Sequence, residues 1–132
     1  MNRKVLLVDS DPAERAALSF ALELEGFEVE TFSDSAALDS RAELIGSACL
    51  LLDQRQAGSN GLAYLAGLRK RGVHSPAAIM VTNPTKAMRQ FADAAFARLI
   101  EKPLLDDALP TLLRELLAGG SSALFQVTGT ET

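Results

Sequence analysis

Four side chains that could carry chemistry follow short apolar segments of the sequence. Each comes at or just after the end of such a segment: Asp9, Asp53, Thr82 and Lys102. Clustered carboxylates bind a hard cation such as Mg2+. A carboxylate can also attack phosphorus and form an aspartyl phosphate, while a metal ion and a lysine neutralise the phosphoryl oxygens. With a hydroxyl to sense the added group, these four side chains form a set suited to accepting phosphate.

The elements that must position these residues alternate regularly along the chain. Short apolar runs typical of strands are separated by segments with helical spacing. Strands are expected at 5–8, 27–32, 48–52, 77–81 and 97–100, and helices at 12–25, 35–45, 61–71, 85–95 and 106–118. This alternation predicts an α/β fold whose parallel sheet is covered on both faces. Because ligands bind beyond the carboxyl ends of the strands in such sheets, the four side chains are expected to meet at one rim.

The first two elements carry clear local signals. Asp11, Pro12 and Glu14 stand where a capping box would place an N-cap, a first-turn proline and a glutamate at the third helical position. Gly26 is expected to end that helix. Residues 27–30 alternate between apolar and charged, which predicts a half-exposed strand at the edge of the sheet.

Composition favours a single domain in the cytoplasm. The 132 residues are 48% hydrophobic, enough for a core without disulfides or metal. The single cysteine, Cys49, fits a reducing compartment and is expected to be buried in a strand. Residues 1–118 are expected to form the domain, and residues 119–132 a flexible C-terminal tail or truncated linker. The first apolar run is too short for a membrane span, and the net charge of −4 indicates no direct binding to DNA.

The motifs, taken in order, resemble those of response-regulator receiver domains of two-component signalling. The matching pieces are VLLVDSDP at 5–12, LLLDQR at 50–55 followed by Gly61, VT at 81–82 and IEKP at 100–103. The resemblance covers residues 3 to about 118. It implies a flavodoxin-like, doubly wound, five-stranded parallel sheet with strand order 2-1-3-4-5 and five helices.

The resemblance also implies a role for each residue of the rim. Asp53 matches the phosphoacceptor, Asp9 the first acid of a Mg2+ site, and the main-chain carbonyl of Arg55 a further metal ligand. Thr82 matches the switch hydroxyl and Lys102 the phosphate-binding lysine, whose bond to the next proline is expected to be cis. Phosphate would come from a histidine kinase or a phosphotransfer protein. Such a domain is not an enzyme beyond catalysing its own aspartyl phosphorylation and dephosphorylation.

Four departures from the family pattern concern the chemistry and the output surface. Ser10 stands where the family usually has a second acid that contacts the metal, so Mg2+ binding is expected to be weak, with Ser10 or Asp11 as the alternative ligand. Asp11 is expected mainly as an N-cap. Leu99 replaces an aromatic switch residue. The loop at 54–58 lacks the usual Met-Pro pair, and Lys102 follows Thr82 by only 20 residues, which shortens the start of the fourth helix.

Three functions are therefore open. The first is a phosphorylatable, Mg2+-dependent domain that signals through protein contacts and could form a homodimer through the segments 85–95, 97–100 and 106–118. The second is a pseudo-receiver, an interaction module that works without phosphorylation. The third is a flavodoxin-like binder of a nucleotide or flavin. It is disfavoured because residues 10–12, Ser-Asp-Pro, stand in place of a glycine-rich phosphate loop.

Overall fold

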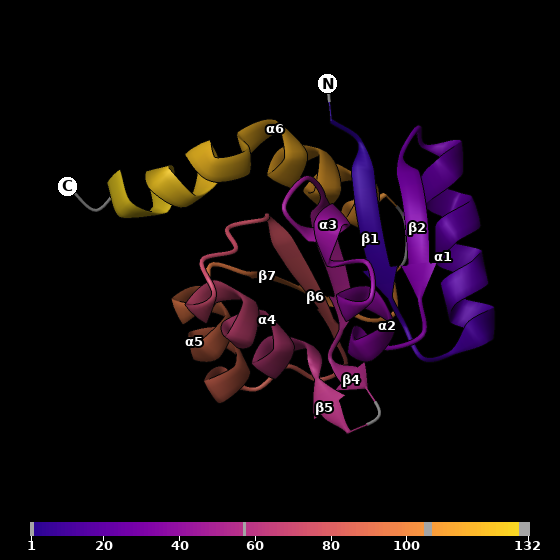
Figure 1. Ribbon diagram of the computed structural model, residues 1–132, viewed down its shortest axis with the longest axis horizontal. Coiled ribbons are helices and arrows are strands. Elements are labelled where there is room, and N and C mark those ends of the chain that lie inside the picture. Colours follow the sequence, from indigo (N-terminus) through magenta and orange to yellow (C-terminus); the bar gives the residue numbers. More distant parts are fainter. Residues whose placement is uncertain (1, 57, 105–106, 130–132) are drawn as a thin grey trace.

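The computed structural model describes residues 2–56, 58–104 and 107–129, with side chains up to residue 119. Its main sheet has five parallel strands: β1 (Lys4–Val8), β2 (Glu28–Phe32), β3 (Cys49–Asp53), β6 (Ala77–Val81) and β7 (Arg98–Glu101). They are arranged in the order β2-β1-β3-β6-β7 (Figure 1). This is the predicted order 2-1-3-4-5, and it confirms the flavodoxin-like, doubly wound α/β fold.

The described part of the chain forms six helices, whereas five were predicted: α1 (Pro12–Leu24), α2 (Ser35–Asp39), α3 (Ala42–Ile45), α4 (Gly61–Lys70), α5 (Lys86–Ala94) and α6 (Ala108–Gly129). The single helix predicted over 35–45 was wrong, because the chain leaves the helical conformation near residue 41. The hydroxyl of Ser40 donates to the carbonyl of Ala37, and Arg41 has φ −120° and ψ 42°, outside the helical region. Two short helices therefore replace one.

Alternation of side chains along the strands divides the core into two layers. One layer lies between the sheet and the helices α2 to α5, and the sheet contributes Leu6, Val8, Leu50, Leu52, Ile79 and Val81 to it. The other lies against α1 and α6, and the sheet contributes Val5, Leu7, Cys49, Leu51, Ala78 and Met80. Strands β3 and β6 are buried throughout because helices cover both faces. The edge strands β2 and β7 are only partly buried, and the edge position of β2 is confirmed.

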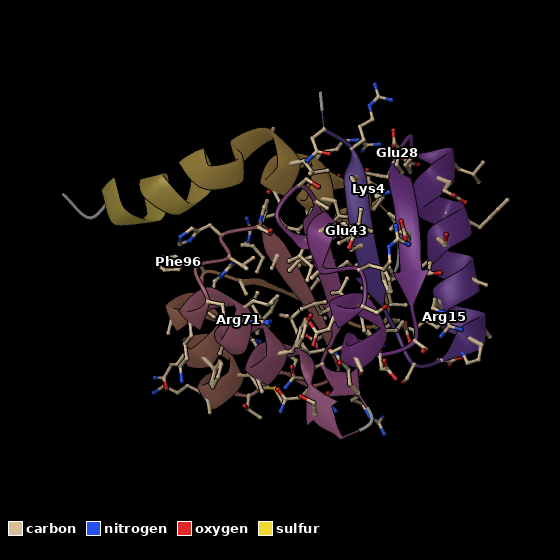
Figure 2. The ribbon with its side chains drawn as sticks, viewed as in Figure 1. Lys4, Arg15, Glu28, Glu43, Arg71 and Phe96 are labelled. Atoms are coloured by element: carbon tan, nitrogen blue, oxygen red, sulfur yellow. The ribbon has the colours of Figure 1, made fainter. Side chains whose placement is uncertain are left out.

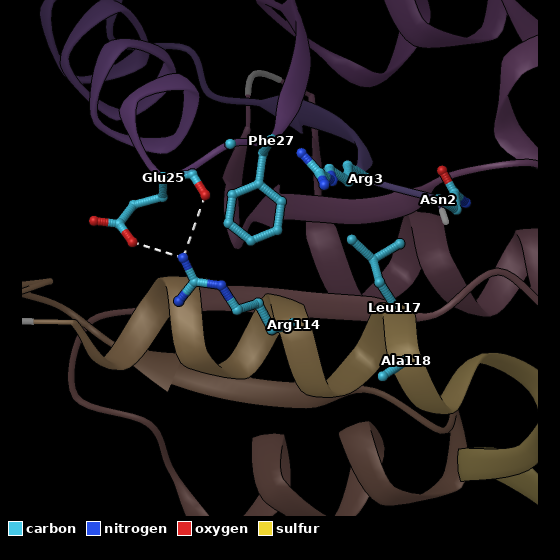
Figure 3. A pocket seen from close by; sticks show the side chains of 8 residues that line it. Asn2, Arg3, Glu25, Phe27, Arg114, Leu117 and Ala118 are labelled. Carbon is cyan, nitrogen blue, oxygen red and sulfur yellow. Dashed lines mark hydrogen bonds and ion pairs between the residues drawn. The ribbon is translucent and has the colours of Figure 1, made fainter.

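Arg114 ties α6 to the amino-terminal side of the sheet. Its guanidinium lies 2.6 Å from the Glu25 carboxylate and 5.5 Å from the centre of the Phe27 ring (Figure 3). These residues line a pocket together with Asn2, Arg3, Gly26, Leu117 and Ala118. The pocket adjoins the starts of β1 and β2, so it lies at the opposite end of the strands from the four predicted reactive residues.

The last helix is longer than the helix predicted over 106–118. Asp106, its predicted first residue, lies outside the described residues, and α6 continues through the glycine pair at 119–120 to Gly129. A helical glycine costs about 1 kcal/mol relative to alanine, which weakens a helix without forcing it to end. The assignment of 119–132 as a linker stays a prediction. None of the described helices, α6 included, is long and apolar enough to cross a membrane.

Cys49 is fully buried in β3, as predicted. Burial raises the pKa of its thiol from 9.0 to about 12. Since the thiolate is the reactive form, we expect Cys49 in the native protein to react with an aromatic disulfide reagent at least ~1,000-fold more slowly than in urea-unfolded protein. Release of the coloured thiolate at pH 8 measures both rates. Equal rates would contradict the burial of β3.

Candidate functional site

Three carboxylates and one lysine meet where β1 and β3 end. Asp9 follows β1, Asp53 is the last residue of β3, Lys102 follows β7, and Glu14 lies in the first turn of α1. Asp9, Glu14 and Asp53 each offer one oxygen, and these oxygens lie within 4.8 Å of one another. The Lys102 ammonium is 2.8 Å from Glu14 Oε1 and 3.0 Å from Asp53 Oδ2. The structure thus brings together three of the four predicted residues and adds Glu14.

Asp9 is fully buried, and its carboxylate is only partly satisfied. Oδ1 accepts a hydrogen bond from the Asp11 N–H at 2.9 Å. Oδ2 is buried and has no hydrogen-bond partner among the described residues. Burial raises the pKa of Asp9 to about 6, the Asp11 N–H opposes that rise, and the nearby charges of Glu14 and Asp53 add to it. A buried carboxylate oxygen without a partner is costly, so this oxygen is suited to receive a cation.

Asp53 is 5% exposed and is held from two sides. Its Oδ1 accepts a hydrogen bond from the main-chain N–H of Arg55 at 3.2 Å, and its Oδ2 accepts one from Lys102. Burial lowers the pKa of Lys102, but the hydrogen bonds to Glu14 and Asp53 outweigh burial and raise it. A positively charged ammonium therefore stays beside the Asp53 carboxylate at neutral pH.

Gly61, the first residue of α4, packs directly on the main chain of Asp53. A Cβ at this position would lie 2.8 Å from the Asp53 carbonyl oxygen. The Gly61 N–H also donates to the Gln54 carbonyl at 3.2 Å. Only glycine allows this close approach, which explains the glycine that follows LLLDQR in the sequence.

Gly61→Ala is expected to destabilise the fold by about 1–3 kcal/mol, because backbone next to Asp53 must move. Gly67→Ala is the matched control in the same helix, where an added Cβ meets nothing within 4 Å. That change is expected to stabilise the protein by up to ~1 kcal/mol. Urea unfolding followed by circular dichroism measures both free energies. Equal stabilities of the two variants would show that the approach of Gly61 to Asp53 is not close.

The two predicted switch positions, Thr82 and Leu99, differ in exposure. Thr82 is exposed and lines a groove that also contains Glu14 and Lys102. It does not cap α5, because the Thr85 hydroxyl accepts the N–H of Met88. Leu99 pairs with Ile79 in the sheet and packs, partly buried, against the core layer on the α2–α5 side. Thr82 therefore lies at a groove, whereas Leu99, at the position where the family usually has an aromatic residue, is part of the core packing.

The start of α1 differs from the predicted capping box. Asp11 is the N-cap, and its Oδ1 accepts the N–H groups of Ala13 at 2.9 Å and Glu14 at 3.3 Å. The reciprocal bond is absent from the described contacts, because the Asp11 N–H donates to Asp9 and the Glu14 carboxylate turns to Lys102. The capping-box prediction was therefore right for Asp11 and wrong for Glu14. The Glu14 carboxylate pairs with the charged Lys102, and the Asp11 N–H donates to Asp9 instead.

Two neighbours of Asp9 do not contact its carboxylate through their side chains. Ser10 is exposed at the end of β1. Arg15, labelled in Figure 2, donates from its guanidinium to the main-chain carbonyl of Asp9 at 2.7 Å. Neither side chain therefore provides a partner for the buried oxygen Oδ2 of Asp9.

The loop after Asp53 forms a small hairpin that the sequence did not predict. Its strands are β4 (Arg55–Gln56) and β5 (Ser59–Asn60), while Ala57, part of the predicted loop, lies outside the described residues. The Gln56 amide donates to the Asp53 carbonyl at 2.9 Å, and its oxygen contacts the Ser35 hydroxyl. The Gln54 side chain accepts the N–H of Leu62 at 2.9 Å. Hydrogen bonds from two glutamines therefore hold the loop where the family usually has Met-Pro. The Lys102–Pro103 bond is cis, as the resemblance implied.

Glu14 is the site residue that sequence reasoning missed. The capping-box pattern gave its carboxylate a local partner, so no contact outside α1 was expected. The available signal was position: Glu14 lies in the first turn of the helix predicted from residue 12, five residues after Asp9 at the end of the first strand. An acid placed there can reach the rim from the first turn of the helix.

Comparison with known proteins agrees with the fold. Residues 5–114 match the family model described as the response regulator receiver domain. The chain is 31% identical over 118 residues to the transcriptional regulatory protein FixJ of Azorhizobium caulinodans, covering 86% of this chain and 54% of that protein. It is 31% identical over 117 residues to the C4-dicarboxylate transport transcriptional regulatory protein DctD of Pseudomonas aeruginosa, covering 86% of this chain and 25% of that protein. The chain thus spans about half, or less, of the length of these relatives.

Solved structures show the same fold. The crystal structure of FixJ-N aligns with a TM-score of 0.76 at 25% identity, covering 87% of this chain and 92% of that one. The chemotaxis protein CheY4 of Vibrio cholerae aligns with a TM-score of 0.78 at 23% identity, covering 87% and 98%. The family match spans most of the sequence and the carboxylate–lysine cluster lies at the expected rim, so the chain belongs to the response-regulator receiver domains of two-component signalling.

Proposed function

We propose that Asp53 is the phosphoacceptor of this receiver domain. The observation that carries the proposal is the buried Asp53 carboxylate, which has the Lys102 ammonium 3.0 Å from one oxygen and the Asp9 carboxylate in the same cluster. A nucleophilic carboxylate needs positive charge nearby to stabilise the phosphoryl oxygens. Lys102 supplies that charge.

The residues around Asp53 fit a Mg2+ ion. Asp9 offers the unpartnered oxygen Oδ2, and Asp53 offers a second carboxylate. The main-chain carbonyl of Arg55 is the third proposed ligand: an extended residue points its N–H and C=O to the same side, and the Arg55 N–H faces Asp53. Asp11 is engaged as a helix cap and Ser10 is exposed, so we propose Asp9, Asp53 and Arg55 as the main ligands and keep Asp11 or Ser10 as the alternative. Oxygen ligands of this kind suit Mg2+.

Phosphate transfer then requires one displacement at phosphorus. An Asp53 oxygen attacks the phosphorus of a phosphohistidine donor, an O–P bond forms as the P–N bond breaks, and the electron pair leaves with the imidazole nitrogen, which takes a proton from water. Bound Mg2+ would supply positive charge to the phosphoryl oxygens. Lys102 adds a second positive charge, and Thr82 offers a hydroxyl from the same groove. The product is an aspartyl phosphate that Thr82 can sense.

The proposed partners follow from the family. Receiver domains exchange phosphate with histidine kinases or phosphotransfer proteins, and one of these is the proposed donor. Three predictions from the sequence stay predictions: a homodimer through α5, β7 and α6, signalling by protein contacts, and a cytoplasmic location. The relatives named above are transcriptional regulatory proteins, but the net charge of −4 argues against direct DNA binding by this chain.

Phosphate uptake with and without Mg2+ tests this function. The full chain is incubated with a small-molecule phosphodonor in Mg2+ or in a chelator, and its intact mass is measured. We expect a gain of one phosphoryl group in Mg2+ and none in the chelator. A chain that gains no mass and binds no Mg2+ at millimolar concentration would instead be a pseudo-receiver. A flavin that copurifies with the chain would favour the third function.

A further inference from the structure

The side chains at the rim carry enough negative charge to neutralise a divalent cation only when Glu14 is counted. Asp9, Asp53 and Lys102 together carry a formal charge of −1, whereas adding Glu14 brings the cluster to −2. Of the three acids, Asp9 and Asp53 are almost fully buried, and buried charges are retained only when they are paired or bind a metal. A cluster of −2 matches a divalent ion.

Glu14 is placed to reach that ion. Asp11 satisfies the main-chain N–H groups at the start of α1, which leaves the Glu14 carboxylate free of the cap. One of its oxygens lies within 4.8 Å of oxygens of both Asp9 and Asp53. Mg2+ holds its oxygen ligands at 2.0–2.1 Å, so ligands on opposite sides of the ion are about 4 Å apart. The three carboxylates therefore need only a small side-chain movement to share one ion.

A second observation points to a cation inside this cluster. Lys102 is the ammonium that contacts the acids, and it contacts Glu14 and Asp53. The Asp9 oxygen Oδ2 is buried without a partner among the described residues. An ion-pair network around Lys102 leaves this oxygen unsatisfied, whereas a cation that binds the Asp9 carboxylate through Oδ2 would satisfy it.

We propose that Glu14 is the third carboxylate ligand of the divalent-cation site and takes the place of the acid missing at Ser10. Without the ion, Glu14 shares Lys102 with Asp53. With the ion, Glu14 turns to the metal and releases Lys102 to Asp53 and the incoming phosphoryl group. The inference rests on the proposed function, because it assigns a further ligand to the same Mg2+ site.

Mg2+ affinity of Glu14 variants tests the assignment. Binding of MgCl2 to the full chain is measured by calorimetry and by the shift in thermal unfolding. Glu14→Gln is expected to raise the Kd for Mg2+ at least ~10-fold. Glu23→Gln, an exposed site on the same helix, is the matched charge control and is expected to change the Kd less than ~2-fold. Circular dichroism confirms that both variants are folded.

Two outcomes separate this inference from the proposed function. Wild-type affinity in Glu14→Gln would overturn the role of Glu14 and leave the phosphoacceptor site intact. Absence of Mg2+ binding in the wild-type protein would overturn both.

A double variant excludes an indirect effect through Lys102. If Glu14 acted only by drawing Lys102 away from Asp53, then Glu14→Gln would have no effect once Lys102 is replaced by glutamine. We expect the loss caused by Glu14→Gln in the Lys102→Gln background to be of the same size, ~10-fold, as in the wild type. Disappearance of the loss in that background would overturn the assignment of Glu14 as a ligand.

Discussion

Replacing Asp53 by asparagine is expected to abolish phosphate uptake. The amide is nearly isosteric with the carboxylate, so the variant keeps the position of the side chain at the end of β3. Its oxygen can still accept the Arg55 N–H or the Lys102 ammonium. It lacks the negative charge of a nucleophile that attacks phosphorus. The expected result is therefore a folded protein with no measurable gain of a phosphoryl group by intact mass spectrometry.

The control for Asp53→Asn is Asp93→Asn. Asp93 is exposed on α5 and outside the carboxylate cluster, so its replacement removes the same charge without touching the rim. This variant is expected to take up phosphate at the wild-type rate. Uptake by Asp53→Asn at that rate would show that another residue is the acceptor.

Replacing Asp9 by asparagine is expected to stabilise the metal-free protein at neutral pH. Burial raises the pKa of Asp9 from 3.8 to about 6 in the folded state. Between these values the folded protein holds a proton that the unfolded chain has released, so the free energy of unfolding falls as the pH rises from about 4 to 6. Above pH 6 the folded protein carries a buried, partly unsatisfied charge. A shift of about two pKa units corresponds to about 3 kcal/mol, which is the upper limit of the expected gain at pH 7.

Urea unfolding at two pH values measures this effect. Asp9→Asn should be more stable than the wild type at pH 7, and the difference should shrink toward zero below pH 4, where Asp9 is protonated. Added Mg2+ should stabilise the wild type and have less effect on the variant, since the Asp9 carboxylate is a proposed ligand. A variant that is less stable than the metal-free wild type at pH 7 would contradict the unfavourable burial of this charge.

Most of the fold was predictable because it depends on patterns within each segment. The apolar runs at 48–52 and 77–81 became buried central strands, and the alternation at 27–30 became an edge strand. The break near Arg41 was not predictable from periodicity. It depends on a local bond from the Ser40 hydroxyl and on ion pairs of Arg41 with Glu30 and Glu43. Only the Arg41–Glu30 pair reaches β2, so it is visible only when β2 and the helical segment are placed side by side, whereas the two local contacts do not show in the apolar periodicity.

The site was predictable in part for a related reason. Asp9, Asp53 and Lys102 each stand at a strand end, and parallel strands bring these ends together. The Glu14 carboxylate had two possible partners: the nearby Asp11 N–H, and Lys102, which lies 88 positions after Glu14 in the chain. Sequence spacing favoured the local partner. Tertiary structure supplied the charged one, and so the cluster gained an acid that the motifs did not indicate.

Locating the phosphoryl group on the chain tests the role of Asp53 most directly. After incubation with Mg2+ and a phosphodonor, borohydride reduces an aspartyl phosphate to homoserine, and peptide mass spectrometry identifies the converted residue. We expect homoserine at position 53, in the peptide that contains the end of β3, and aspartate unchanged at positions 9 and 11. Homoserine at another position, or none in protein that has been exposed to the donor, would contradict this role of Asp53.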